Sequence, residues 1–198
     1  MITRKRWNDG PCDTDFQIAH PSFVANLIWM LILALAAIGV TFALSCVTPF
    51  AALAAALAGT IRLRASLRIM IVVWLTNQVI GFGFFHFPLT VNTVLWGTAI
   101  GGAAVATTIA ASVVMKCASS WATPLRLGIA LLISFAVYEV TLLGAAGLLG
   151  GFETFRPAIV AQLGLINAVS LVGLIVLNEV AAALSRPWLG RIPRLVRP

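Results

Sequence analysis

Long apolar runs without a charged residue are the feature that most restricts how this chain can fold. Residues 23–45 contain no Asp, Glu, Lys or Arg, and a helix needs about 20 such residues to cross a bilayer. Of the 198 residues, 61% are hydrophobic and only 10% are charged, against about 25% charged in a soluble domain. The sequence therefore excludes a disordered chain, a coiled coil and an ordinary water-soluble fold, and it indicates an integral membrane protein.

Six apolar runs predict an all-α bundle of six membrane-spanning helices. Prolines and charged residues separate the runs, and Pro88, Pro124 and Pro157 mark three of the boundaries. The predicted spans are residues 23–45, 47–61, 67–87, 92–115, 124–149 and 158–184. We expect three regions: a polar tail of residues 1–22, a transmembrane domain of residues 23–185 and a basic tail of residues 186–198.

The distribution of Lys and Arg predicts the orientation. Under the predicted topology Arg156 alone lies on one side, and the other twelve lie in the two tails and on the opposite side. Such residues accumulate on the cytoplasmic side of a membrane protein, so we expect a multi-pass protein of the cell inner membrane with both termini in the cytoplasm. The basic residues are not interleaved with aromatic ones, which argues against a nucleic-acid partner.

Polar residues inside the predicted spans are the candidate functional residues. Glu139 follows Tyr138 near the middle of the span 124–149, where a charged residue costs about 2.5–3.5 kcal/mol on insertion scales. One interpretation gives Glu139 a role in binding a ligand or a proton. The other is a hydrogen-bonded Glu that ties two helices together.

Two other spans carry polar residues at helical spacing. Trp74, Asn77 and Gln78 share one face of the span 67–87, which suits a planar polar ligand or, alternatively, an amide clamp between helices. Asn167, Ser170 and Asn178 form a stripe on the span 158–184. The predicted substrate-binding residues are Trp74, Asn77, Gln78, His86, Trp96, Tyr138, Glu139, Asn167 and Ser170.

The connection between the third and fourth predicted spans is rich in aromatic residues. It contains Phe84, Phe85, His86 and Phe87, with Trp96 shortly after. Aromatic residues are common anchors at a membrane interface. The alternative is an aromatic lid over a pocket open to the outside, with His86 as a polar contact.

Motifs for catalysis and cofactor binding are absent from the sequence. It has no Walker A sequence, no nucleophile elbow, no His pair at metal-ligand spacing and no pair of intramembrane carboxylates. We therefore expect no enzyme activity, no catalytic residues, no metal site and no cofactor.

The outline resembles the substrate-binding S components of energy-coupling-factor vitamin transporters. The resemblance covers residues 23–185 and rests on six predicted helices, cytoplasmic termini, small-residue pairs and polar groups in the third, fifth and sixth spans. It implies that the chain captures a vitamin or related micronutrient from outside and works with a transmembrane coupling subunit and ATPases. Two alternatives remain open: a non-catalytic assembly subunit of a larger membrane complex, and a small proton-coupled carrier that uses Glu139.

Overall fold

All regular secondary structure in the described part of the chain is helical. The structure is a computed structural model, and it describes residues 48–185. The expected first span and both tails lie outside the described residues. The helices are α2 (Phe50–Thr60), α3 (Leu63–Val79), the π-helical turn η1 (Ile80–Phe84), α4 (Val91–Cys117), α5 (Thr123–Leu149), the 3₁₀ turn η2 (Phe152–Phe155) and α6 (Pro157–Ser185).

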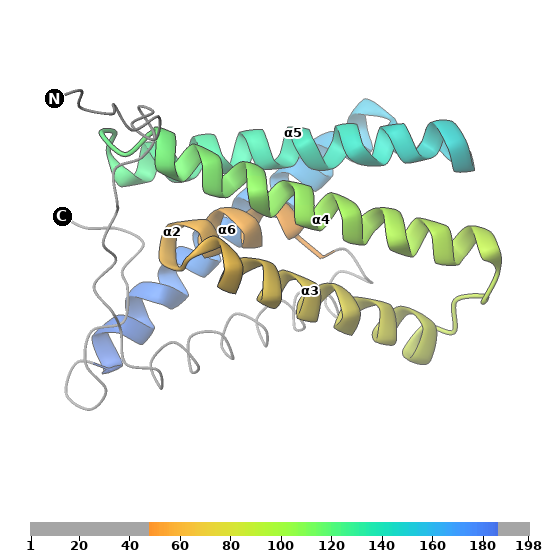
Figure 1. The fold of residues 1–198 in the computed structure, drawn as a ribbon, viewed down its shortest axis with the longest axis horizontal. Coiled ribbons are helices and arrows are strands. Elements are labelled where there is room, and N and C mark those ends of the chain that lie inside the picture. Colours follow the sequence, from red (N-terminus) through yellow and green to blue (C-terminus); the bar gives the residue numbers. More distant parts are fainter. Residues whose placement is uncertain (1–47, 186–198) are drawn as a thin grey trace, which may run out of the picture.

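Within the described residues, four helices are long and apolar enough to cross a membrane. They are α3 with η1, α4, α5 and α6, and they confirm the helices predicted from residues 67, 92, 124 and 158, with ends shifted by at most four residues. Successive long helices run in alternating directions (Figure 1). Length and composition therefore indicate a membrane-embedded protein.

Local sequence signals set the ends of the long helices. The Thr90 hydroxyl accepts a hydrogen bond from the Thr93 backbone N–H at 3.2 Å, which caps the start of α4. Pro124 lies in the first turn of α5, where a missing N–H costs nothing. Gly150 and Gly151 end α5 with φ angles of 80° and 96°, a conformation that favours glycine.

The short helix α2 corrects the predicted six-span count. It has 11 residues, so it is about 16 Å long, roughly half of a hydrocarbon core of about 30 Å. The apolar run 47–61 is longer, but Pro49 precedes the first helical residue and Ile61 is extended. The prediction that 47–61 spans the membrane is therefore wrong, and the described residues do not support six spans.

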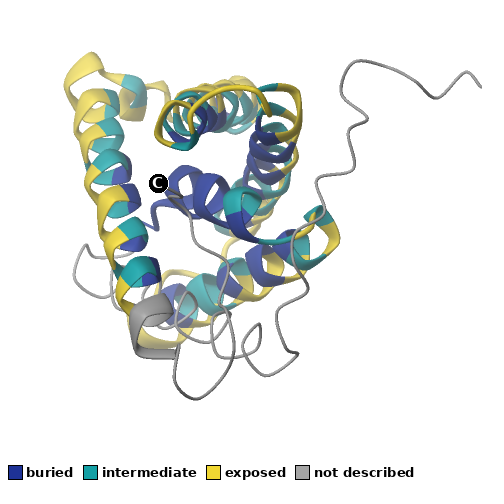
Figure 2. Ribbon diagram, turned by 90° about the vertical axis from the view of Figure 1, so that its left-hand side faces the viewer, coloured by how far each residue is buried: buried dark blue, intermediate teal, exposed yellow. Residues whose placement is uncertain are grey.

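The helix α2 forms the core of the bundle. It packs against α3, α4, α5 and α6, and Ala52, Ala54, Ala55 and Ala56 have no exposed surface. Buried residues face the middle of the bundle, whereas exposed residues cover its outer faces (Figure 2). Small side chains let the four long helices approach α2 closely.

The basic residues of the described region lie at one end of the bundle, apart from Arg156. This end, called here the arginine end, is formed by the α2–α3 and α4–α5 connections (Figure 1). It carries Arg62, Arg64, Arg68, Lys116 and Arg126. Arg156 lies at the opposite end, just before α6.

Candidate functional site

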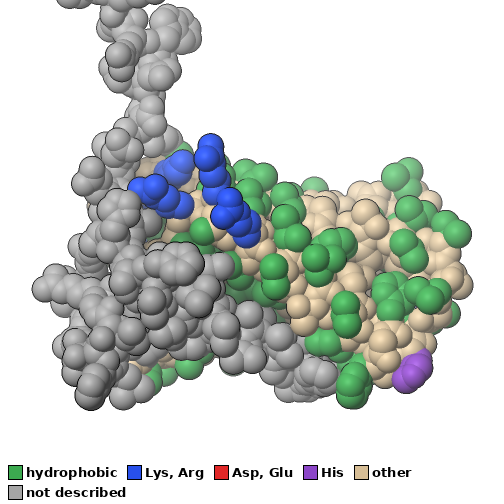
Figure 3. Space-filling view, turned by 60° about the horizontal axis from the view of Figure 1, so that its bottom comes forward, with side chains coloured by type: hydrophobic (Ala, Val, Ile, Leu, Met, Phe, Trp, Pro, Cys, Tyr) green, Lys and Arg blue, Asp and Glu red, His purple; other side chains and the backbone are tan. Residues whose placement is uncertain are grey.

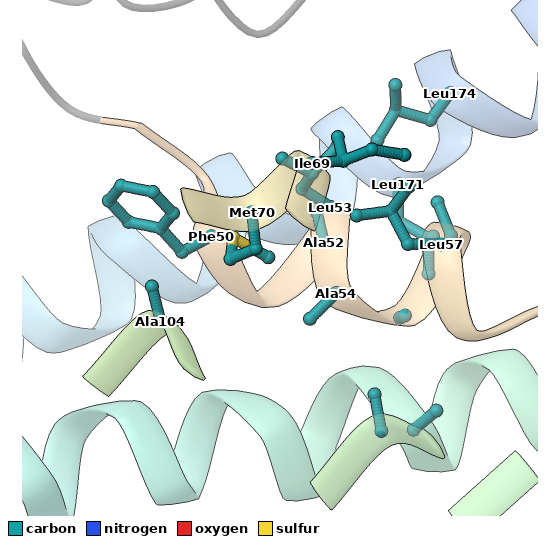
Figure 4. Close-up of a cluster of buried hydrophobic side chains, with 14 of the residues drawn as sticks. Phe50, Ala52, Leu53, Ala54, Leu57, Ile69, Met70, Ala104, Leu171 and Leu174 are labelled. Atoms are coloured by element: carbon teal, nitrogen blue, oxygen red, sulfur yellow. The ribbon is translucent and has the colours of Figure 1, made fainter. Parts of the chain in front are cut away.

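The start of α2 lies at the middle of the bundle. Phe50, its first residue, belongs to the same buried cluster as Ala104, the central residue of α4, and the two side chains lie close together in Figure 4. The ring of Phe50 also packs on Tyr138 of α5, with ring centroids 6.0 Å apart. The chain therefore enters α2 near mid-depth and reaches the arginine end at Arg62.

The amide of Asn77 meets the residue before the α2 cap. The Thr48 hydroxyl donates a hydrogen bond of 2.9 Å to Asn77 Oδ1. This contact joins the chain segment before α2 to α3, and it occupies the carbonyl oxygen that we expected to face a ligand. No sequence pattern points to Thr48, because this residue lies in the linker before a short helix.

The amide of Asn167 meets the first turn of α2. The Ala52 backbone N–H donates to Asn167 Oδ1 at 3.0 Å, and Asn167 Nδ2 donates to the Leu163 carbonyl at 2.9 Å. The first N–H groups of a helix have no partner inside the helix. Asn167 supplies one from α6, at a depth where water is scarce.

Residues from three long helices thus gather at the start of α2. We call Thr48, Asn77, Tyr138 and Asn167, together with Phe50, the mid-bundle cluster. The structure brings together here three of the predicted site residues, Asn77, Tyr138 and Asn167. Ser170, one turn beyond Asn167, is half-buried and has no hydrogen bond to the side chains described.

Glu139 adds a carboxyl group directly after Tyr138 on α5. Its side chain is half-buried. Atom Oε1 is buried, and it has no hydrogen-bond partner among the described residues. A buried polar atom without a partner costs free energy, so this oxygen is suited to a donor from a ligand, a proton or another chain.

Trp74 and Gln78 pack between α3 and α4. Trp74 Nε1 donates to the Gly97 carbonyl at 2.9 Å. A Cβ atom on Gly101 would lie 2.6 Å from the Trp74 ring, and one on Gly97 would clash with Gln78 Oε1. Trp74 and Gln78 therefore contact a neighbouring helix, as the second interpretation of this face, a clamp between helices, expects.

His86 lies away from the mid-bundle cluster. It is exposed in the α3–α4 connection with a φ of 52°, and its Nδ1 is 2.9 Å from the Phe84 carbonyl. In the same connection Phe85 and Phe87 stack with centroids 6.2 Å apart. These contacts are made inside the connection itself.

Trp96 also lies away from the mid-bundle cluster, near the start of α4. A Cβ on Gly151 would lie 3.4 Å from its ring, so Trp96 packs beside the α5–α6 connection. His86 and Trp96 are therefore both at the end of the bundle opposite the arginine end.

Asn178 continues the polar stripe of α6 towards the arginine end. It has no exposed surface, and neither amide atom has a hydrogen-bond partner within residues 48–185. Buried hydroxyls elsewhere are satisfied: Thr107, Thr108 and Ser112 each donate to a carbonyl one turn earlier in α4. Asn178 is thus the exception among the buried polar residues of the two helices.

Arg126 has a structural contact that the sequence did not indicate. It is only 7% exposed, and its Nη2 donates to the Met115 carbonyl at 2.7 Å. The carbonyls at the end of a helix lack partners inside the helix, so Arg126 of α5 caps the end of α4.

The mid-bundle cluster contains groups that can form hydrogen bonds. It offers amide and hydroxyl groups, an aromatic ring and the neighbouring carboxyl of Glu139. Among the described residues no three His, Cys, Asp or Glu side chains lie together as a metal site would require. The arrangement can hold polar groups by hydrogen bonds and can hold a proton on Glu139.

Comparisons of the chain with known proteins identify no relative. No family model, no curated protein sequence and no solved structure matches the chain.

Proposed function

We propose that this chain is a membrane-embedded binding subunit that takes up a small polar molecule from outside the cell. The observation that carries the proposal is the start of α2 at the middle of the bundle, where Asn77, Tyr138 and Asn167 gather around it. A helix start and two amides at this depth cost free energy, and a protein whose only role is to span the membrane has no need of them.

A helix that begins inside a membrane is suited to binding. Its first N–H groups carry a partial positive charge, and half-length helices at mid-membrane are used for substrate binding in several transporter architectures. Here Asn167 satisfies one of these N–H groups. A ligand with acceptor groups would find further donors in the Asn77 amide and the Tyr138 hydroxyl.

Glu139 supports the same proposal. Its buried Oε1 lacks a hydrogen-bond partner among the described residues, and the described Lys and Arg side chains belong to the two ends of the bundle. A donor group of a ligand, or a proton, would satisfy this oxygen in the bound state. In the first case the proposed ligand carries at least one N–H or O–H group.

The resemblance to S components extends the proposal to a substrate class, a location and partner proteins. In this form the ligand is a vitamin or related micronutrient, the protein lies in the inner membrane with cytoplasmic termini, and a coupling subunit with ATPases drives uptake. The resemblance implies that alanine pairs one helical turn apart dock the coupling subunit. The pairs Ala51/Ala55 and Ala54/Ala58 are turned into the bundle, and all but Ala58 are buried. A coupling subunit would therefore dock on another surface of the chain.

A subunit that assembles a larger complex is the second candidate. The half-buried position of Glu139 favours it, because α5 is one of the two long helices with the most exposed surface. On this alternative a polar group of a neighbouring chain meets the Glu139 carboxyl. The two candidates predict different molecules bound to the same residue.

Mass spectrometry of the purified protein tests both candidates. The full chain, Glu139→Gln and the control Glu153→Gln are purified from membranes, and co-purifying small molecules and proteins are identified. Glu153 undergoes the same chemical change but is exposed in η2. We expect a small molecule on the full chain and on Glu153→Gln, and at least a tenfold loss on Glu139→Gln.

The opposite pattern would contradict the binding proposal. If Glu139→Gln released a partner protein, and none of the three preparations held a small molecule, the chain would be an assembly subunit. If Glu139→Gln kept both kinds of molecule, Glu139 would have neither role.

A further inference from the structure

Three arginines at the start of α3 are exposed on the surface of the described part of the bundle. Arg62 precedes the helix, and Arg64 and Arg68 lie in its first two turns. All three side chains are exposed, and their guanidinium groups have no hydrogen bond or ion pair to any residue that the structure describes. Arg126 at the same end differs, because it is buried and caps α4.

The two helical arginines belong to a continuous face of α3. Arg64 and Arg68 are one turn apart, and the same face continues with exposed apolar residues at helical spacing. These are Ile71, Val72, Leu75 and Val79, which are 43%, 55%, 48% and 70% exposed. We call the set of these six residues the arginine-headed face.

Along the arginine-headed face, charged residues are followed by apolar residues, as a charged headgroup is followed by an acyl chain in a lipid. Figure 3 shows Lys and Arg side chains gathered at one end of this side of the molecule, hydrophobic side chains beyond them, and no acidic side chain of the described residues in view. Arg68 and Val79 are 11 residues apart, which corresponds to about 16 Å along the helix. This length is roughly half of the hydrocarbon core, which is about the depth that one acyl chain occupies, and the guanidinium groups lie at the end of this stretch.

The positive charge on this face favours the binding of an anion. Arg64 and Arg68 repel each other at a spacing of one turn, and the described residues offer them no carboxylate. A guanidinium group can donate two parallel hydrogen bonds to the oxygens of one phosphate. An acyl chain attached to that phosphate would lie along Ile71, Val72 and Leu75.

We propose that the arginine-headed face is a binding site for an anionic phospholipid. Arg64 and Arg68 hold the phosphate, and the apolar residues of α3 hold one acyl chain. The site is separate from the mid-bundle cluster, because its side chains point away from α2. It does not depend on which small molecule the protein binds.

Native mass spectrometry of lipid retention tests this site. The full chain in detergent is mixed with equal amounts of phosphatidylglycerol and phosphatidylcholine, and the bound lipids are counted. The same is done for the double variant Arg64→Gln/Arg68→Gln, the single variant Arg68→Gln and the control Arg156→Gln. Arg156 is also exposed but lies at the opposite end of the bundle.

We expect the full chain to retain phosphatidylglycerol in preference to phosphatidylcholine. At about 1 kcal/mol per arginine near a charged lipid surface, the double variant should lower this preference about 30-fold. Arg68→Gln should lower it less, and Arg156→Gln should leave it unchanged. Millimolar inorganic phosphate should not displace the lipid, because it lacks the acyl chain.

Three results would overturn the proposal. One is equal retention of the two lipids by the full chain. Another is a preference that survives in both the single and the double variant, or that falls equally in Arg156→Gln. The third is displacement by inorganic phosphate, which would make the face a site for free anions. Thermal unfolding of each variant in phosphatidylcholine alone separates a lost site from a lost fold.

Discussion

The helices α2 and α5 are both strongly apolar, yet they occupy opposite environments. Almost every residue of α2 is buried, whereas only 17% of the most apolar stretch of α5 is buried. In a soluble protein the more apolar helix would be the inner one. In a membrane, lipid and protein interior are equally apolar, so hydrophobicity does not separate the two environments.

Side-chain size separates the two helices instead. The helix α2 consists largely of alanine, which allows four neighbours to approach it, whereas α5 presents Leu132, Val140 and Leu148 to the outside. A polar contact also distinguishes the buried helix, because Asn167 of α6 accepts a hydrogen bond from the Ala52 backbone N–H of α2. The interior of this bundle is therefore defined by close packing and by satisfied backbone groups.

The largest expected effect comes from enlarging an alanine of α2. Ala55 has no exposed surface, so Ala55→Leu forces extra carbons into a packed core and should lower the free energy of unfolding by about 3 kcal/mol. Ala136→Leu on the exposed face of α5 should change it by less than about 0.5 kcal/mol. SDS-induced unfolding in mixed micelles measures both, and equal losses would show that α2 is not the core.

A smaller effect should follow from removing the amide at the start of α2. Asn167→Leu leaves the Ala52 N–H without its acceptor, and a buried unpaired donor costs about 2 kcal/mol. Gln162→Leu is the control, because Gln162 is exposed on the same helix. The same unfolding assay should show a loss for Asn167→Leu alone. Similar stability of the two variants would argue against a buried start of α2.

The smallest effect distinguishes two adjacent glycines of α4. A Cβ at Gly101 would meet the Trp74 ring at 2.6 Å, whereas a Cβ at Gly102 would meet nothing within 4 Å. Gly101→Ala should cost about 1 kcal/mol, since the steric penalty exceeds the gain in helix propensity. Gly102→Ala should be neutral or stabilise by up to about 1 kcal/mol. A reversed order in the unfolding assay would mean that Trp74 does not pack on Gly101.

Much of the fold could be predicted from the sequence, because length and apolar runs are local properties. The runs that begin near residues 67, 92, 124 and 158 are long enough to define spanning helices, and Pro124, Pro157 and Gly150 mark their ends. The true role of residues 47–61 could not be predicted. An apolar run of 15 residues fits either a short span or a buried half-length helix, and only tertiary packing decides between them.

The candidate site could be predicted in part. Helical spacing put Trp74, Asn77 and Gln78 on one face, but it could not say that Trp74 and Gln78 would meet Gly101 and Gly97 of another helix. The spacing of residues along one helix does not show which residues of a neighbouring helix they contact. For the same reason Thr48 was missed, although it bonds Asn77 across 29 positions of sequence.

The depth at which α2 begins is tested most directly by cysteine cross-linking in membranes. In a background with Cys12, Cys46 and Cys117 replaced by serine, Phe50→Cys is paired with Ala104→Cys or with Thr93→Cys. Thr93 is on the same side of α4, 11 residues or about 16 Å nearer the end opposite the arginine end. We expect a short cross-linker to join positions 50 and 104 and to leave positions 50 and 93 separate. A cross-link between 50 and 93, with none between 50 and 104, would contradict it, because α2 would then begin at the membrane surface.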